Sequence, residues 1–271
     1  VMAEDEVRII ETDDDTWEQD AEDDSLYPYD PTTADIDIRE EPHSIFDFMR
    51  KYDQGKLIID PDFQRNLVWK PEQKSQFVES VILNFPLPAF YVNQRTDGKY
   101  NIVDGLQRTT TLHEFVNNEF SLKGLEALTD LNGCNFSELI EKDEEYQTKI
   151  EDKKLTIYVI RPSVPIKVVY DIFKRINTNG TPLNRQEVRN CIYTGSSTKL
   201  LKELAEKDYF RKAIGNGISS KRMKDREAVL RYLTFRLFDY NDYKGDMSGF
   251  VEEAMKKINR LEPKDLNKLR K

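Results

Sequence analysis

The sequence has few of the residues that build disulfide frameworks and protein metal sites. Its 271 residues include only two cysteines, Cys134 and Cys191, and two histidines, His43 and His113. So few cysteines in a chain of this length indicate a reducing, cytoplasmic setting and argue against a disulfide scaffold or a zinc site. The histidines are far apart in the sequence and unaccompanied, so they do not suggest a metal pair.

Several longer patterns are also absent. No stretch approaches the roughly 18 consecutive apolar residues of a membrane span, so no membrane partner is expected. The acidic N-terminal stretch lacks the apolar segment of a secretory signal peptide. The sequence contains neither a Gly-x-x-x-x-Gly-Lys-Ser/Thr phosphate loop nor a His-Glu-x-x-His motif. Two histidines are too few for a His-Asn-His-type nuclease site, so we expect that this chain alone does not cut DNA.

Charge is distributed unevenly along the chain. Residues 1–24 hold twelve acids and one base, a net charge of −11, whereas the rest of the chain holds 40 bases and 38 acids. A highly charged segment with few apolar residues cannot bury enough surface to fold, so we predict a disordered acidic leader and linker over residues 1–41. Two interpretations of the leader stay open: a solubilising segment, or a mimic of DNA that competes for a basic groove on the body.

The remaining sequence alternates between strand-like and helix-like patterns. Apolar periodicity predicts strands near residues 56–60, 87–93, 99–103 and 155–160 and helices near 44–55, 71–85, 106–118 and 165–176. From residue 196 onwards every segment reads as helical. We therefore predict an α+β protein, with a small mixed sheet and flanking helices over residues 42–195 and a helical C-terminal region over 196–271.

Local signals support these elements. Thr96-Asp97-Gly98 is typical of a hairpin turn, and Asn184 with Glu187 predicts a capping box. Pro71 suits a first helical turn. The buried face of the helix that follows is predicted to comprise Phe77, Val78, Val81, Ile82 and Phe85.

The stretch IVDGLQRTTTL, which begins at Ile102, has the residues of an anion site. A strand ends at Val103, Gly105 permits a sharp turn, and the helix start that follows presents free backbone N–H groups and a partial positive charge. The guanidinium of Arg108 suits phosphate, Asp104 suits Mg²⁺ held through water, and Gln107 suits the orientation of a water. The structural alternative is a turn in which Arg108 only pairs with a local carboxylate.

Four ordered segments resemble the domain-of-unknown-function family 262, the ParB/sulfiredoxin-like domain of GmrSD-type modification-dependent restriction and phage-defence proteins. The resemblance covers about residues 42–240. The segments are DPDFQRNLVWKPEQ, YNIVDGLQRTTTL, IFKRINTNGTPLNRQEVRNCIY and RMKDREAVLRYLTF. It implies a ParB/sulfiredoxin-like fold that binds a nucleoside triphosphate with Mg²⁺, hydrolyses it in some members, and recognises DNA, modified DNA included.

The resemblance also implies roles for individual residues. Asp104 and Gln107 would be catalytic, with Asp104 also the metal ligand. The nucleotide-binding residues would be Gln64, Arg65, Gly105, Arg108, Lys174, Arg175, Asn177 and Gly180. A nuclease is expected from a separate subunit, and a homo-oligomer is left open.

Leu106 is a departure from the family pattern, because a glutamine usually stands there. If that glutamine contacts the nucleotide or its water, hydrolysis here is weakened or lost; if it only packs, Leu106 is harmless. Redox chemistry like that of the sulfiredoxins is excluded at this turn, which has no cysteine. The second hypothesis is therefore a non-catalytic DNA-binding or adaptor protein of the same fold.

A basic cluster near the C-terminal end is a candidate DNA contact. Lys221, Arg222, Lys224 and Arg226 lie beside an aromatic run, and lysine and arginine contacts to phosphates dominate DNA affinity. The alternative is a solvated helix face above a core stripe.

Overall fold

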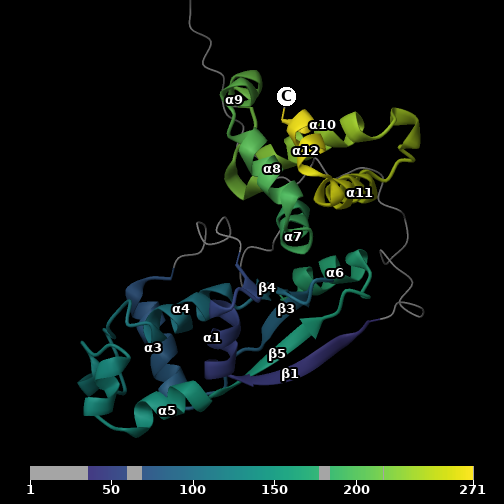
Figure 1. Ribbon diagram of the computed structural model, residues 1–271. Helices are drawn as coiled ribbons and strands as arrows, with labels where there is room; N and C mark the ends of the chain where they lie inside the picture. Colours follow the sequence, from purple (N-terminus) through teal and green to yellow (C-terminus); the bar gives the residue numbers. More distant parts are fainter. Residues whose placement is uncertain (1–35, 60–68, 177–183, 216, 271) are drawn as a thin grey trace, which may run out of the picture. The chain divides into compact units, whose positions relative to one another are not determined.

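The computed structural model describes residues 36–59, 69–176, 184–215 and 217–270, with Ile166, Lys174 and Lys221 described by their backbone alone (Figure 1). The chain divides into two compact units. We call their described parts the α/β unit, residues 36–176, and the helical unit, residues 184–270. No helix within these ranges is long and apolar enough to cross a membrane.

Five strands of the α/β unit form one mixed sheet in the order β1-β5-β3-β4-β2. β3 runs parallel to β5 and antiparallel to β4, while β1 pairs antiparallel with β5 and β2 parallel with β4. The predicted hairpin joins β3 to β4 through Gly98, whose φ is +79°. The strands are β1 Ile38–Ser44, β2 Leu57–Ile58, β3 Phe90–Gln94, β4 Tyr100–Asp104 and β5 Lys154–Ile160.

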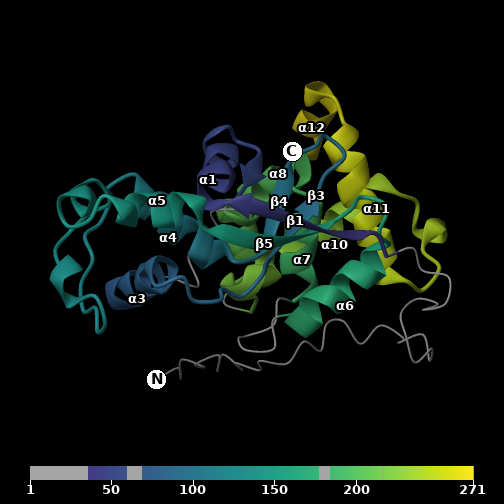
Figure 2. The same ribbon diagram turned by 90° about the horizontal axis from the view of Figure 1, so that it is seen from below.

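Helices complete the α/β unit. Four of them, α1, α3, α4 and α5, lie together, away from the fifth, α6, in both ribbon views (Figures 1 and 2). One hydrophobic core joins α1, α3 and α4 to the strands, with Phe48, Val78 and Leu112 packed in the same cluster as Phe90 and Val92 of β3. The helices are α1 Ile45–Asp53, α3 Pro71–Ile82, α4 Leu106–Val116, α5 Glu145–Asp152 and α6 Ile166–Ile176.

The helix signals in the sequence are confirmed at the start of α3 and wrong at its end. Pro71 is the first residue of α3, and Val78, Val81 and Ile82 are buried. Phe85 lies beyond the helix and is 54% exposed. Asn84, with a φ of +58°, turns the chain after Ile82 and so removes Phe85 from the helical face.

The strand β1 overlaps the last residues of the predicted linker, which we extended to residue 41. Ile38–Ser44 pairs with β5 along its whole length, and its side chains alternate only weakly between exposed and half-buried positions. An edge strand of this kind is held by backbone hydrogen bonds, which leave little trace in hydrophobic periodicity. The folded part of the chain therefore begins earlier than the composition indicates.

Six helices, all in the described part of the chain, build the helical unit. α8, α10 and α11 share a second hydrophobic core, which includes Leu201, Leu230, Leu233 and Met255. α7 lies in this unit, whereas we placed it before the boundary at 195/196. The helices are α7 Arg185–Ile192, α8 Ser196–Ala205, α9 Asp208–Ile214, α10 Lys224–Leu237, α11 Met247–Arg260 and α12 Pro263–Leu269.

The predicted fold class is confirmed: a five-stranded mixed sheet with flanking helices precedes an all-helical part. The domain boundaries at 41/42 and 195/196 stay a prediction.

Candidate functional site

The turn between β4 and α4 depends on Gly105. This residue is the N-cap of α4 and has a φ of +97°, in the left-handed region. A Cβ atom here would lie 2.5 Å from Cδ1 of Phe90, which is fully buried. Glycine is therefore required twice, by the backbone conformation and by the close approach of the Phe90 ring.

Arg108 braces the turn from inside. Its Nη2 donates to Oδ2 of Asp104 at 2.8 Å and to the Ala89 carbonyl at 3.1 Å, and its Nη1 donates to the Pro88 carbonyl. The guanidinium carbon lies 4.3 Å from the centre of the Phe90 ring, and the residue is 8% exposed. Burial lowers the pKa of the guanidinium from its ordinary value, and the Asp104 carboxylate acts in the opposite direction.

Gln107 connects two of the sequence motifs. Its Oε1 accepts a hydrogen bond of 3.1 Å from the backbone N–H of Trp69, 38 residues away. Trp69 is the first described residue after segment 60–68, and its ring packs edge-on against Phe77 of α3 at 5.4 Å. Trp69, a residue of the motif that contains Gln64 and Arg65, is therefore bonded to the first turn of α4.

Asp104 is the carboxylate of this turn. Its side chain is 32% exposed, and only Oδ2 is used by Arg108. No group of three or more histidine, cysteine, aspartate or glutamate side chains in the described ranges could hold a metal ion by itself. Asp104 fits Mg²⁺ in the way usual for nucleotide enzymes, in which one or two carboxylates share the ion with substrate phosphates.

Leu106 packs against the hydrophobic core of the α/β unit. Leu106 is half-buried, and the contacts of its side chain with the core are apolar. This contact supports the view that leucine replaces a packing residue.

The structure brings Asp104, Gly105, Gln107 and Arg108 together in one turn. Of the other predicted nucleotide-binding residues, only Arg175 has a described side chain. Arg175 lies on α6, where its Nε donates to Oδ2 of Asp171 at 3.0 Å. The side chain of Lys174 lies outside the described part of the chain. Outside it as well are Gln64, Arg65, Asn177 and Gly180.

The sequence model of one protein family, described as the GmrSD restriction endonuclease N-terminal domain, matches residues 45–194, more than half of the chain. The chain belongs to this family. Its matched part is thus a module of a modification-dependent restriction system. No curated protein matches the chain.

The GmrSD N-terminal domain match ends two residues after α7. At α7 a set of polar contacts, which we call the polar clamp, joins the third and fourth motifs. Asn184 caps α7, and the predicted capping box with Glu187 is confirmed. Asn184 Nδ2 also donates to the Arg222 carbonyl at 2.8 Å, and Arg222 Nη2 donates to Oε2 of Glu187 at 3.2 Å. Arg222 and Met223 both have positive φ, at 56° and 61°, so the clamp holds an uncommon backbone conformation in place.

The sequence did not predict that Arg222, in the fourth motif, bonds to the capping box of the third motif. The capping pattern was visible, but the partner 35 residues further on, Arg222, was assigned to DNA. Of the remaining cluster, Lys224 and Arg226 lie in the first turn of α10 and are half-buried. Only the backbone of Lys221 is described. The DNA-binding assignment of these residues stays a prediction.

Proposed function

We propose that this GmrSD N-terminal domain binds a nucleoside triphosphate together with Mg²⁺ at the turn of residues 104–108. The hydrogen bond between Trp69 N–H and Gln107 Oε1 carries the proposal, because it joins the first two family motifs at the start of a helix. Helix starts bind phosphate through free backbone N–H groups and the positive end of the helix dipole.

Each residue of the turn has a proposed part in binding. The N–H groups of Leu106 and Gln107 would face the phosphate chain, since the first turn of a helix has no internal partners for them. Asp104 would share the metal ion, which neutralises phosphate charge and polarises the γ-phosphoryl group when bound. Arg108 would hold Asp104 and the turn in shape, because both of its terminal nitrogens already have protein partners.

The other motif residues would complete the site from outside the turn. Gln64 and Arg65 belong to the same motif as Trp69, so they are the proposed side-chain contacts to the phosphates. Lys174, Arg175, Asn177 and Gly180 stay proposed nucleotide ligands on the strength of the family motif. A direct contact of Arg108 with phosphate would require its guanidinium to leave the Pro88 and Ala89 carbonyls.

Hydrolysis is the finer part of the proposal. Gln107 would orient the attacking water from the amide nitrogen, since its oxygen is engaged by Trp69. The core contact of Leu106 supports turnover without a glutamine at that position. Leu106→Gln is therefore expected to lower the melting temperature without raising the rate of phosphate release.

The test combines binding with turnover. Each of the four common ribonucleoside triphosphates with Mg²⁺ should raise the melting temperature at millimolar concentration, because ligands that bind the native state stabilise it. Asp104→Asn should weaken this shift, and the exposed Asp97→Asn should not. Phosphate release should be measured with and without DNA; the absence of any thermal shift in the wild type would contradict the proposal.

DNA binding is the second candidate function, and the charge of the helical unit favours it. Residues 184–271 hold 21 bases and 13 acids, whereas residues 25–183 hold 19 bases and 25 acids. A positive surface attracts nucleic acid at low salt. Replacement of Lys224 and Arg226 by glutamine should weaken DNA binding and reduce its salt dependence. A protein that binds DNA without releasing phosphate would be the adaptor of the alternative hypothesis.

A further inference from the structure

One row of side chains crosses the sheet on the face opposite the core. Phe90 and Val92 of β3 lie in the core, so the alternation of a strand places Tyr91, between them, on the other face. In the register of the sheet Tyr91 pairs with Tyr158 of β5 on one side. On the other side a bulge between Tyr91 and Val92 brings Asp104, the last residue of β4, opposite Tyr91.

The two tyrosines form a stacked pair. Their ring centroids are 5.2 Å apart and their planes differ by 28°. Both residues are half-buried, so each keeps some surface exposed to solvent. Neither hydroxyl shares a hydrogen bond with another residue in the described ranges. The pair therefore offers an aromatic surface with two polar groups at its rim.

Charge near the pair comes from the proposed phosphate site. Burial raises the pKa of the Tyr91 phenol, and neighbouring Tyr158 and Asp104 add to this effect while Arg108 opposes it. The phenol is therefore a neutral hydrogen-bond donor at neutral pH. Asp104 and Arg108 therefore lie close enough to Tyr91 to act on its phenol, in agreement with the strand register.

We propose that Tyr91 and Tyr158 form the subsite for the nucleobase of the nucleotide whose phosphates bind at residues 104–108. This inference rests on the proposed function. The tyrosines stand one and two strand spacings from Asp104, each about 4.8 Å, which is the scale that separates a base from its phosphate chain. Every base has an aromatic face, so a site of this kind grips purines and pyrimidines with little discrimination.

A structural role is the rival explanation. Cross-strand aromatic pairs stabilise sheets without any ligand, and such a role would give the same stacked geometry. The two explanations predict different effects of tyrosine substitutions on the affinity for a ligand that has no base. Tripolyphosphate with Mg²⁺ has the phosphates alone, so it separates contacts to the base from the integrity of the turn.

The experiment compares the affinities of the full chain and four variants for ATP, CTP and tripolyphosphate, each with Mg²⁺. Tyr91→Leu and Tyr158→Leu should weaken both nucleotides by about tenfold or more, as loss of base stacking does, and leave tripolyphosphate affinity unchanged. Phe85→Leu removes an exposed aromatic ring from the same unit, and it should change neither the nucleotide affinities nor the tripolyphosphate affinity. Tyr91→Phe keeps the ring and should retain nucleotide affinity.

Each other outcome is decisive. Nucleotide affinities that stay at the wild-type level in both leucine variants would overturn the subsite and leave the proposed function intact. A parallel loss of tripolyphosphate affinity would show that the tyrosines support the turn and would also overturn the subsite. Wild-type protein that binds neither nucleotides nor tripolyphosphate would overturn the proposed function itself.

A measurement on the wild-type protein covers the case in which the leucine variants fail to fold. The nucleoside triphosphate of 2-aminopurine fluoresces, and stacking of its base on an aromatic ring quenches that fluorescence. We expect the fluorescence to fall when the analogue binds. Excess unlabelled ATP or tripolyphosphate should displace the analogue and restore its fluorescence. A bound analogue that keeps its full fluorescence would overturn the subsite.

Discussion

Gly105 and Arg108 shape the turn at the start of α4 through different physical effects. Gly105 supplies a backbone conformation and leaves room for the Phe90 ring. Arg108 joins α4 to the segment before β3 through two backbone carbonyls and to the end of β4 through Asp104. Both residues fix the shape of the turn, which is the proposed phosphate site, through contacts within the protein.

Gly105→Ala should destabilise the protein more than the same change in the hairpin. Gly98 also has a positive φ, of +79°, but a Cβ there would meet nothing within 4 Å, whereas at Gly105 it meets Phe90 at 2.5 Å. Strain from φ alone costs on the order of 1 kcal/mol, so the excess cost of Gly105→Ala measures the clash. Urea denaturation of both variants gives the comparison; equal free energies of unfolding would show that the ring moves aside freely.

Arg108→Ala should lower the free energy of unfolding by about 2–3 kcal/mol, because it leaves buried carbonyls and Asp104 without their donor. Arg108→Lys should recover only part of this loss, since an ammonium cannot reproduce the planar fork. Arg95→Ala removes the more exposed pair with Asp97 and should cost under about 1 kcal/mol. If Arg108→Ala unfolds like the wild type but no longer binds nucleotide, its guanidinium contacts the ligand directly.

The sequence predicted the residues of this turn but not their contacts. The order strand, glycine and helix is local, and periodicity with one glycine was enough to place it. The Pro88 and Ala89 carbonyls that bind Arg108 are defined only once β3 lies beside β4. The partner that the sequence did suggest, a local carboxylate, is present in Asp104.

At the scale of helices, α7 and α10 meet around buried polar groups. The Asn184–Glu187 cap of α7 holds Arg222 immediately before α10. Asp225, in the first turn of α10, is 7% exposed and accepts a 2.8 Å hydrogen bond from the Arg226 N–H. The capping box was predictable because its two members are three residues apart; its connection to α10 was not, because it depends on the packing of the two helices.

Asp225→Asn should raise the melting temperature at pH 7 and lose this advantage as the pH falls toward 4. Burial raises the pKa of the Asp225 carboxyl above its ordinary value of 3.8. The folded state therefore binds this proton more tightly than the unfolded chain, and the resulting stability is present below pH 3.8 and lost as the pH rises through the raised pKa.

Thermal melts of Asp225→Asn and of the exposed control Asp242→Asn between pH 4 and 7 make the comparison. The control should follow the wild type throughout. An Asp225→Asn curve parallel to the wild type across this range would show that the carboxyl titrates alike in both states.

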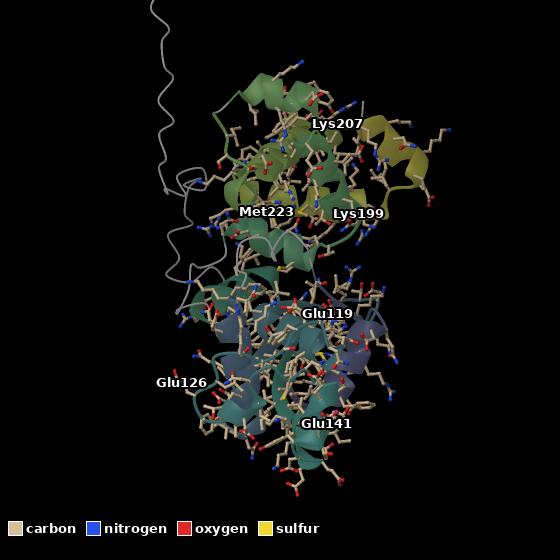
Figure 3. All side chains as sticks on the ribbon, turned by 90° about the vertical axis from the view of Figure 1, so that its left-hand side faces the viewer. Glu119, Glu126, Glu141, Lys199, Lys207 and Met223 are labelled. Atoms are coloured by element: carbon tan, nitrogen blue, oxygen red, sulfur yellow. The ribbon has the colours of Figure 1, made fainter. Side chains whose placement is uncertain are left out.

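For the whole molecule, the main property is the separation of charge along the chain. The leader of residues 1–24 carries −11, residues 25–183 carry six more acids than bases, and residues 184–271 carry eight more bases than acids. Lys199 and Lys207 of the helical unit and Glu119, Glu126 and Glu141 of the α/β unit are labelled in Figure 3. The total charge of −9 therefore conceals a C-terminal part with a net charge of +8.

Deletion of residues 1–30 should leave the melting temperature nearly unchanged. If the leader mimics DNA, the deletion removes negative charge that would compete for a basic groove on the body. DNA binding should then tighten at low salt, and the gain should fade as salt screens both interactions. A full-length variant with the acids of residues 1–24 changed to asparagine and glutamine is the matched control. A large drop in melting temperature would contradict the prediction and show that the leader packs on the body.

Composition predicted the leader, which lies outside the described residues, and periodicity predicted most of the sheet, but the sequence did not predict β1. The strands β3 and β5 have apolar residues on alternate positions that enter the core. β1 contributes mainly backbone pairing, and its polar residues resemble the linker before it. The pairing of β1 with β5, more than 100 residues further along the chain, cannot be read from the pattern of a single sequence.

Both edges of the sheet are poor places for another chain to pair. At one edge β1 carries Glu40, Glu41 and Pro42; the proline lacks an N–H, and a second copy would bring like charges together. At the other edge β2 has two residues, too few to support a further strand. We expect concentrated solutions of this protein to resist β-type aggregation, and Pro42→Val with Glu41→Val to increase thioflavin fluorescence on prolonged incubation.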